Sequence, residues 1–302
     1  MLETSLCGIH LANPLILASG IRGNSAGLLV RAGKEGAGAA TSKSCSLLPR
    51  EGHANPTMVG ESGVYMNAIG LSNPGVDEEI DEIREAVAKA GIPIIASIYA
   101  KEVRDFAAVA ACISEAKPAM IEVDISCPNV HREGAMFSSY PKDAAEVCVA
   151  VRDAISIPFS AKLSPDVPNI GEIARACVGS GASCITAINT IGGMHIDARA
   201  RRAVLANAFG GISGPAIKPV ALKAVYSIRR AVGEKVPIIG TGGISTGIDA
   251  IEMLMAGATC VGVGTAIALR KESAPFRAIA DEMQAFMKEE GFKKISDLNL
   301  QE

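Results

Sequence analysis

The sequence predicts an α/β fold, namely a closed TIM (β/α)8 barrel with insertions after its second and sixth strands. Eight short apolar runs rich in β-forming residues alternate with stretches whose apolar residues recur at helical spacing. The runs are apolar nearly throughout, which is typical of parallel strands covered on both faces. Because 302 residues suit one large barrel, we expect a single domain over residues 1–302.

The predicted elements follow one another along the whole chain. The strands are residues 14–19, 38–44, 93–99, 120–126, 158–164, 184–190, 236–242 and 259–265. Helical patterns between them include residues 76–90, 103–116, 142–155, 170–181 and 247–258. The alternative is a doubly wound open sheet. Such a sheet would carry G-x-G-x-x-G after its first strand, and "ASGIRGNSAG" (18–27) has glycines at other spacings.

Two connections are too long for simple loops. Residues 45–75 follow the second strand and residues 191–213 follow the sixth. Long connections in compact domains usually form lids or binding loops. Both leave the carboxyl end of a strand, which is the catalytic end of a barrel, so we expect both to contribute to a binding site.

Composition and charge exclude several classes of protein. A net charge of −3 and a pI of about 5.9 argue against a nucleic-acid-binding face. The chain has no apolar run of about 20 residues and no signal-peptide pattern, so we expect a cytoplasmic protein without a membrane partner. Eight cysteines lack close spacing with one another or with histidines, so we expect neither a disulfide framework nor a metal site.

Polar residues appear late in several predicted strands. Lys43 ends the second strand, Asp124 to Cys127 the fourth, Lys162 the fifth, and Asn189 with Thr190 the sixth. In a barrel these ends meet at one mouth. Lysine is rarely buried without a partner, so two lysines inside apolar runs indicate an anionic or electron-rich ligand.

Glycine clusters end the last two strands. "GTGG" (240–243) and "GVGT" (262–265) are each followed by a helical pattern. Glycine lets backbone N–H groups approach a phosphate, and a helix N-terminus adds a favourable dipole. The loops after strands seven and eight are the usual phosphate site of such barrels, so we expect a phosphorylated ligand there.

A cysteine is placed where the fourth strand runs out. Pro128 cannot extend a central strand, so Cys127 is expected at the barrel mouth. Cations such as Lys43 and Lys162 would favour its thiolate. A thiolate can serve as nucleophile or as general base. Because no clear Cys–His–Asn/Asp pattern is present, proton abstraction is favoured over acyl transfer.

Several longer motifs resemble one enzyme family over nearly the whole chain. The chain resembles class 1 dihydroorotate dehydrogenase at "MNAIGLSNPG" (66–75), "SCPNV" (126–130), "AKLSP" (161–165), "NTIGGMHID" (189–197), "GGISGPAIKP" (210–219), "GTGGI" (240–244) and "GVGTA" (262–266). "NAIGLSNPG" and "GGISGPAIKP" look most like class 1B, the NAD-linked heteromeric branch.

The resemblance implies an FMN-binding TIM barrel that oxidises (S)-dihydroorotate to orotate in de novo pyrimidine (UMP) biosynthesis. Cys127 would be the catalytic base that removes the C5 proton, while hydride passes from C6 to flavin N5. Electrons would then reach NAD through a partner subunit that carries FAD and a 2Fe-2S cluster. The resemblance also implies a homodimer, or a heterotetramer with that electron-transfer subunit.

The resemblance carries over site residues one by one. The residues matching those that hold the substrate are Lys43, Asn67, Ala68, Ile69, Gly70, Leu71, Asp124, Asn129, Asn189 and Thr190. The residues matching those that hold FMN are Ser19, Lys43, Ser44, Ser97, Asp124, Lys162, Ile188, Gly214, Gly242, Gly243, Gly264 and Thr265.

Two positions depart from the family pattern, which usually has Asn where this chain has Ser97 and Asp124. An ionised carboxylate only accepts hydrogen bonds and repels an anionic substrate. We hypothesise that Lys43 or Lys162 neutralises Asp124. Three other functions stay open: a class 1A-like enzyme that reduces fumarate, a dihydropyrimidine dehydrogenase-like flavoenzyme, and a non-catalytic FMN-binding subunit.

Overall fold

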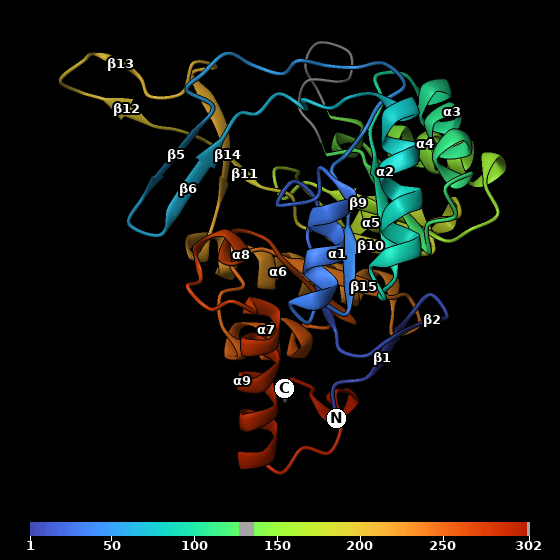
Figure 1. Ribbon diagram of the computed structural model, residues 1–302, viewed down its shortest axis with the longest axis vertical. Coiled ribbons are helices and arrows are strands. Elements are labelled where there is room, and N and C mark those ends of the chain that lie inside the picture. Colours follow the sequence, from blue (N-terminus) through green and yellow to red (C-terminus); the bar gives the residue numbers. More distant parts are fainter. Residues whose placement is uncertain (127–135, 301–302) are drawn as a thin grey trace.

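The computed structural model describes residues 1–126 and 136–300. Eight parallel strands close into a barrel in the order β10-β15-β16-β3-β4-β7-β8-β9 (Figure 1). These strands are β3 (Leu15–Leu17), β4 (Ala39–Thr41), β7 (Ile94–Ile98), β8 (Met120–Asp124), β9 (Phe159–Leu163), β10 (Cys184–Ala187), β15 (Ile238–Thr241) and β16 (Cys260–Val263). Each lies within one of the eight predicted runs, so the predicted barrel is confirmed.

Helices follow the strands and cover the outside of the barrel. They are α1 (Ala26–Lys34), α2 (Val76–Lys89), α3 (Val103–Ser114), α4 (Pro141–Ala154), α5 (Ile170–Gly179), α6 (Lys218–Val232), α7 (Gly247–Met255), α8 (Thr265–Leu269) and α9 (Pro275–Glu289). The five helical patterns named from sequence correspond to α2, α3, α4, α5 and α7. Within the described ranges, no helix combines the length and the apolar character needed to cross a bilayer.

Local sequence explains where several helices begin. The Thr246 side chain accepts a hydrogen bond from the Asp249 N–H, and the Asp249 carboxylate accepts one from the Thr246 N–H, which forms a capping box at α7. Pro141 and Pro275 occupy the first turns of α4 and α9, where their missing N–H groups would be unpaired in any case.

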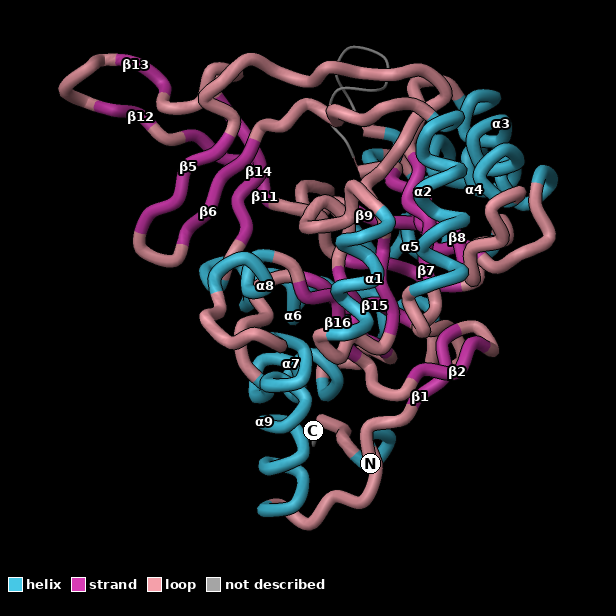
Figure 2. Tube along the Cα trace, viewed as in Figure 1, coloured by secondary structure: helices cyan, strands magenta, loops and turns pink. Residues whose placement is uncertain are grey.

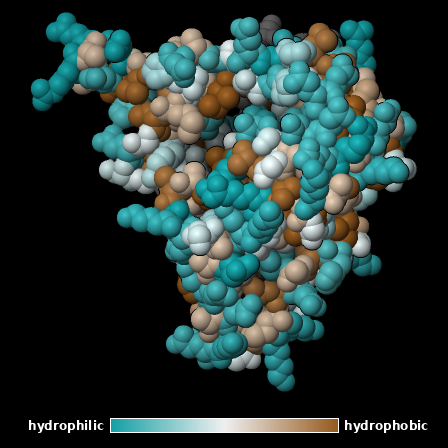
Figure 3. Space-filling model, viewed as in Figure 1, coloured by the Kyte–Doolittle hydropathy of each residue, from teal (hydrophilic) through white to brown (hydrophobic). Residues whose placement is uncertain are grey.

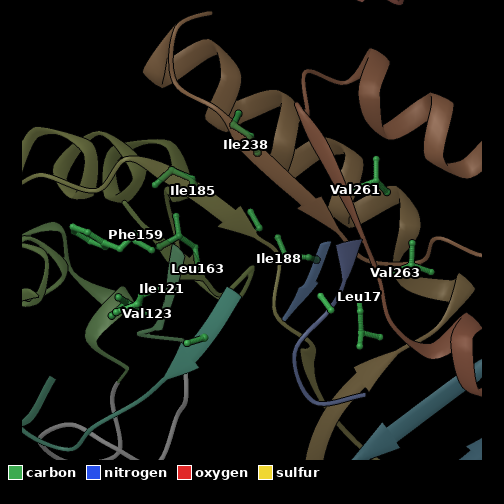
Figure 4. Close-up of a cluster of buried hydrophobic side chains, with 14 of the residues drawn as sticks. Leu17, Ile121, Val123, Phe159, Leu163, Ile185, Ile188, Ile238, Val261 and Val263 are labelled. Atoms are coloured by element: carbon green, nitrogen blue, oxygen red, sulfur yellow. The ribbon is translucent and has the colours of Figure 1, made fainter. Parts of the chain in front are cut away.

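The outward faces of the barrel strands form the main core. Their side chains pack beneath the helices, as Figure 4 shows for Leu17, Val123, Leu163, Ile185 and Val261. All five are buried. Burying such side chains on both sides of a parallel sheet is the dominant favourable contribution to folding.

The inside of the barrel changes character from one end to the other. At the amino end, Ile16, Ile95 and Met120 form an apolar layer, over which pack Leu6 and Leu11. These two leucines come from a hairpin of β1 (Thr4–Leu6) and β2 (Ile9–Leu11), which the sequence analysis did not predict. The apolar end is therefore closed.

The other end of the interior is polar. Side chains alternate along a strand, so Glu122 and Asp124 face the same way as Met120. The register pairs Glu122 with Ser160 and Asp124 with Lys162 on β9. All four of these polar residues are buried. Polarity therefore rises toward the carboxyl ends of the strands, where the predicted site residues gather.

The two insertions fold together into one sheet. The first contributes β5 (Met58–Glu61) and β6 (Val64–Asn67), and the second contributes β11 (Ile191–Met194) and β14 (Phe209–Ser213). The strand order is β11-β14-β6-β5, all antiparallel. Figure 2 shows this sheet beside the barrel. The predicted positions of the insertions are confirmed, and the shared sheet is a feature that the sequence analysis missed.

A hairpin arm projects from this sheet, formed by β12 (Ile196–Asp197) and β13 (Arg202–Ala203). Its surface is hydrophilic (Figure 3), and it carries exposed Arg199 and Arg201. The arm lies away from the strand ends of the barrel (Figure 1). Its charges therefore do not belong to the barrel mouth.

The hairpin that closes the amino end is expected to stabilise the barrel through its apolar contacts. Replacing fully buried Leu6 by Ala should lower the free energy of unfolding by about 2 to 5 kcal/mol, because a cavity is left under the hairpin. Urea denaturation measures this. His10→Ala, at an exposed position of the same hairpin, is the control and should change stability little. Equal stability of the two variants would contradict the proposed packing.

Candidate active site

The sequence-predicted residues are brought together at the carboxyl ends of the barrel strands and on the adjoining insertion sheet. On the first five strands of the barrel, Ser19 follows β3, Lys43 and Ser44 follow β4, Ser97 is in β7, Asp124 is in β8 and Lys162 is in β9. On the last three, Ile188, Asn189 and Thr190 follow β10, Gly242 and Gly243 follow β15, and Gly264 and Thr265 follow β16. On the insertion sheet, Asn67 ends β6 and precedes Ala68, Ile69, Gly70 and Leu71, and Gly214 follows β14.

Cys127 and Asn129, the predicted base and a predicted substrate residue, lie outside the described residues. In the sequence they come shortly after strand β8, which ends at Asp124. Their roles stay predictions.

A buried ammonium group is the centre of the site. Lys162 Nζ donates to Ser19 Oγ at 2.6 Å and to Glu122 Oε1 at 3.2 Å. Ser97 Oγ donates to the same Glu122 oxygen at 3.2 Å and hydrogen-bonds Ser44 Oγ at 2.8 Å. One continuous network thus joins the ends of five neighbouring strands, and it contains four of the residues predicted to hold a flavin.

The charge of Lys162 is maintained by its surroundings. Burial alone would lower its pKa, but the charges of Glu122 and Asp124 and the hydrogen bond to Glu122 outweigh burial and raise the pKa. The Lys162 and Glu122 side chains are 8% and 4% exposed. An ion pair this deeply buried is weak evidence for stability, since both ions lose their hydration. A buried ionisable pair at the strand ends of a barrel marks a candidate functional site.

Glu122 is the main site residue that the sequence analysis missed. It lies in "MIEVDIS", an apolar run, just as Lys162 lies in "PFSAKLS". The reasoning that singled out Lys162 therefore applied to Glu122 as well. The spacing of two between Glu122 and Asp124 also places both carboxylates on one face of a strand.

Asp124 is engaged by its neighbour on the same strand end. Ser126 donates to Asp124 Oδ1 through both its N–H, at 3.1 Å, and its hydroxyl, at 2.5 Å. Asn189 Nδ2 donates in turn to Ser126 Oγ at 2.6 Å. The hypothesis that Lys162 neutralises Asp124 has partial support: the two residues are paired in register and attract each other electrostatically, but the salt bridge of Lys162 is to Glu122.

The block predicted to hold the substrate is fixed through its backbone. His53 N–H donates to Ile69 O at 3.0 Å, and His53 Nδ1 is 3.1 Å from Ala68 O. Arg50 Nε donates to Gly70 O at 2.6 Å. These carbonyl groups point back into the first insertion, so the block has a defined conformation beside the mouth.

The end of the same block is anchored to the barrel. Asn73 Nδ2 donates to Leu71 O at 2.9 Å, and Tyr99 OH donates to the same oxygen at 3.2 Å. Asn73 Oδ1 accepts from Gly75 N–H at 3.0 Å, a side-chain bond two residues along the chain that is typical of asparagine in turns. Leu71 has a positive φ of 59°, a conformation uncommon for leucine, so this anchoring maintains a strained turn.

The loops after the last two strands fit the predicted phosphate site. Gly243 has φ of 78°, and a Cβ there would lie 2.5 Å from Lys218 Cβ and 2.6 Å from its backbone nitrogen. Only glycine can therefore bring the backbone this close to the first turn of α6. Thr265 Oγ1 hydrogen-bonds Ser213 Oγ at 3.1 Å, which links α8 to the insertion sheet. We call the loops that contain Gly243 and Thr265 the glycine cradle. This cradle and the buried ammonium of Lys162 together suit a ligand with a phosphate at one end and an electron-rich ring at the other.

A buried carboxylic acid lies behind Lys43. Burial raises the pKa of Glu79 to about 7, although a hydrogen bond with the Ser42 side chain opposes this rise. Ser42 Oγ also accepts from Ser97 N–H at 3.1 Å. Helix α2 begins with several acidic residues, so sequence alone could not single out the one that is buried.

Among the described residues, no three His, Cys, Asp or Glu side chains gather in a way that could hold a metal ion. The described site offers instead a buried ammonium, hydroxyl groups, amides and a glycine cradle. Such groups bind and orient an organic cofactor and a small polar ligand.

Comparisons with known proteins identify relatives of this chain. The family model described as dihydroorotate dehydrogenase matches residues 1–287. A protein of Methanocaldococcus jannaschii named "Dihydroorotate dehydrogenase B (NAD(+)), catalytic subunit" is 46% identical over 293 residues, covering 96% of this chain and 94% of that protein. One of the same name from Methanothermobacter thermautotrophicus is 44% identical over 300 residues, covering 99% of this chain and 97% of that protein.

A solved structure resembles the fold. The crystal structure of DHODH in complex with ferulenol from Eimeria tenella superposes with a TM-score of 0.85. The match covers 98% of this chain and 87% of that chain at 18% sequence identity. At this identity the likeness supports the barrel fold alone.

Glu79 should make stability depend on pH. Its folded-state pKa of about 7 lies above its ordinary value of 4.5, so the protonated form is favoured in the folded protein. Wild-type stability should therefore fall as pH rises from about 4.5 to about 7, by up to about 3 kcal/mol. Glu79→Gln should lack this fall. Urea denaturation at about pH 5 and about pH 8 measures the difference.

Glu78→Gln is the matched control, because Glu78 is exposed on the same turn of α2. It should keep the wild-type pH dependence. An identical pH dependence in Glu79→Gln and wild type would show that Glu79 is not the buried acid we describe.

Proposed function

This chain belongs to the dihydroorotate dehydrogenase family of oxidoreductases, and we propose that it oxidises (S)-dihydroorotate to orotate with bound FMN, in pyrimidine synthesis. The observation that carries the proposal is the buried Lys162 network at the barrel mouth, next to the glycine cradle. The relatives' shared name supports the substrate and the link to NAD.

The FMN would be held by the network and the cradle. Lys162, Ser19 and Ser44 would face the polar part of its ring system, and the loops with Gly243 and Gly264 would hold its phosphate. When bound, FMN supplies an acceptor for the hydride that leaves the substrate. The protein would contribute a fixed positive charge, which is already paired and hydrogen-bonded before any ligand arrives.

The substrate would lie between this FMN-binding site and the insertion sheet. Lys43 would bind the substrate carboxylate, since a lysine at the rim offers a charge of the required sign. Asn67 at the end of β6 and Asn189 with Thr190 after β10 would bond opposite edges of the ring. Thr190 packs closely against Gly211 of β14, so both insertions help to shape the ring site.

We infer that Cys127 is the base that removes the proton from C5. It follows directly on Ser126, which is buried and hydrogen-bonded at the strand end. A thiolate is a competent base near neutral pH when cations lie nearby, and Lys43 and Lys162 are the candidates here.

Electrons would leave through a partner subunit. The relatives are named as catalytic subunits of an NAD-linked enzyme. No described part of the chain gathers the cysteines that an iron–sulfur cluster needs. We propose that FAD and a 2Fe-2S cluster reside on the partner, and that the assembly is a heterotetramer built on a homodimer of this chain.

The dihydropyrimidine dehydrogenase-like alternative relied on Asp124 as a group that repels an anionic substrate. The contacts of Asp124 with Ser126 direct its Oδ1 atom to the protein itself. This weakens the observation that favoured the alternative.

The purified chain should lose its oxidised-flavin absorbance when dihydroorotate is added without oxygen, and dihydrouracil should have a much weaker effect. Cys127→Ser should slow this reduction by about 100- to 10,000-fold near neutral pH, because serine is a far weaker acid. Stopped-flow absorbance measures the rate. A Cys127→Ser protein as fast as wild type would exclude Cys127 as the base, and faster reduction by dihydrouracil would favour the alternative substrate.

The chain expressed alone should reduce NAD with dihydroorotate far more slowly than the chain combined with its partner, because we place the FAD and 2Fe-2S cluster that pass electrons to NAD on that partner. Fumarate is the comparison acceptor. Steady-state assays with each acceptor separate the cases: efficient NAD reduction by the isolated chain would contradict the need for a partner, and rapid fumarate reduction would favour a class 1A-like enzyme.

A further inference from the structure

A chain of hydrogen bonds connects the end of β8 to the residues after β10, outside the groups proposed to touch the flavin phosphate. Ser126 Oγ donates to Asp124 Oδ1 at 2.5 Å, and Asn189 Nδ2 donates to Ser126 Oγ at 2.6 Å. Asp124 and Ser126 are 6% and 3% exposed. At this burial, water does not replace these bonds readily.

The chemistry of the three groups fixes the direction of this chain. A carboxylate only accepts hydrogen bonds, so Ser126 must give its single hydroxyl proton to Asp124. The Ser126 oxygen then has only acceptor capacity left. The one part of the Asn189 side chain that can bond to an acceptor is its NH2 group. The amide nitrogen of Asn189 therefore faces Ser126.

The other side of the Asn189 amide is fixed by the same logic. Its Oδ1 accepts from Thr190 N–H at 2.7 Å, and Thr190 Oγ1 lies 3.5 Å away. Asn189 N–H donates to Leu163 O at 2.9 Å, which holds its backbone against β9. A flipped amide would place an oxygen against the Ser126 oxygen and an NH2 against the Thr190 N–H, and both contacts would be lost.

An asparagine at position 124 would not define the direction of the hydrogen bonds that Ser126 makes. A carboxamide can donate or accept, so Ser126 could turn its proton toward Asn189 instead. Of the two contacts that distinguish the orientations of the Asn189 amide, only the one with the Thr190 N–H would then keep its direction. The aspartate gives the other contact, with Ser126, a direction as well. The ammonium of Lys162, on the neighbouring strand, attracts this carboxylate.

We propose that Asp124 is a positioning residue that acts through Ser126, together with the Thr190 N–H, to fix the orientation of the Asn189 amide, and so selects a ligand edge that matches one N–H donor and one C=O acceptor. The selection of a ring ligand rests on the proposed function, whereas the orientation itself does not. Asp124 thus contributes to specificity at this edge of the site.

A double-mutant cycle tests the action through Asn189, with orotate as the probe and its binding followed by the flavin absorbance change. Ser126→Ala should weaken orotate binding by about tenfold, because the amide loses its acceptor. Asn189→Ala should weaken binding at least as much. The Ser126→Ala/Asn189→Ala protein should be no weaker than Asn189→Ala alone, since both changes remove one function. Additive losses would overturn the proposal.

Ser160→Ala is the matched control. Ser160 is also a buried serine of the barrel interior, but it bonds Thr186 at 3.1 Å and not Asn189. It should bind orotate as tightly as wild type. A tenfold loss in Ser160→Ala would show that any buried hydroxyl has this effect, and would also overturn the proposal.

A second measurement needs no ligand. With 15N-labelled asparagine, the Asn189 side-chain amide should give one pair of NMR signals, identified by their absence in Asn189→Ala. Asp124→Asn should broaden these signals, because the Ser126 contact then no longer has a fixed direction and holds the amide less firmly. Unchanged signals in Asp124→Asn would overturn the proposal. If wild type failed to bind orotate, the proposed function would fail, and this measurement would still decide whether Asp124 fixes the amide.

Discussion

A charged ammonium group buried inside a barrel of strands is the constraint on which the rest of the site depends. An isolated buried charge is too costly to persist, so Lys162 requires compensating charge and hydrogen bonds at close range. Glu122 supplies the salt bridge, Asp124 adds a second negative charge, and Ser19 accepts a hydrogen bond. Because these groups come from different strands, the network forms only when the barrel closes in the observed register.

The polar interior at one end is possible because the other end is sealed. An apolar layer and the β1–β2 hairpin close the amino end, so the barrel keeps a core there. The insertion sheet lies beside the barrel (Figure 2). Both insertions enter this sheet, through β6 and β14, and Asn67 is paired in register with Gly211, against which Thr190 packs. The division between a stabilising end and a reactive end follows from this arrangement.

The sequence was a good guide wherever a residue's environment was determined locally. All eight barrel strands were predicted, because parallel strands are apolar on both faces and this pattern is distinctive. Lys162 was identified because a lysine contradicts such a pattern. Glu122 contradicts it equally and was missed. The insertion sheet could not be predicted: its strands contain runs such as "IGGM" and "FGGIS", whose glycines weaken β propensity and serve close packing between chain segments distant in sequence. The raised pKa of Glu79 likewise depends on burial that no local pattern reveals.

Equilibrium binding of FMN to flavin-free protein tests most directly whether the ammonium of Lys162, which is paired with Glu122, helps to bind the flavin. We expect wild type to bind FMN, and Lys162→Met to bind it at least about tenfold more weakly, because a charge-assisted contact is lost. Lys34→Met, at an exposed position on α1, should bind as wild type does. A wild-type protein that binds no FMN, or a Lys162→Met protein that binds it equally well, would contradict this role for Lys162.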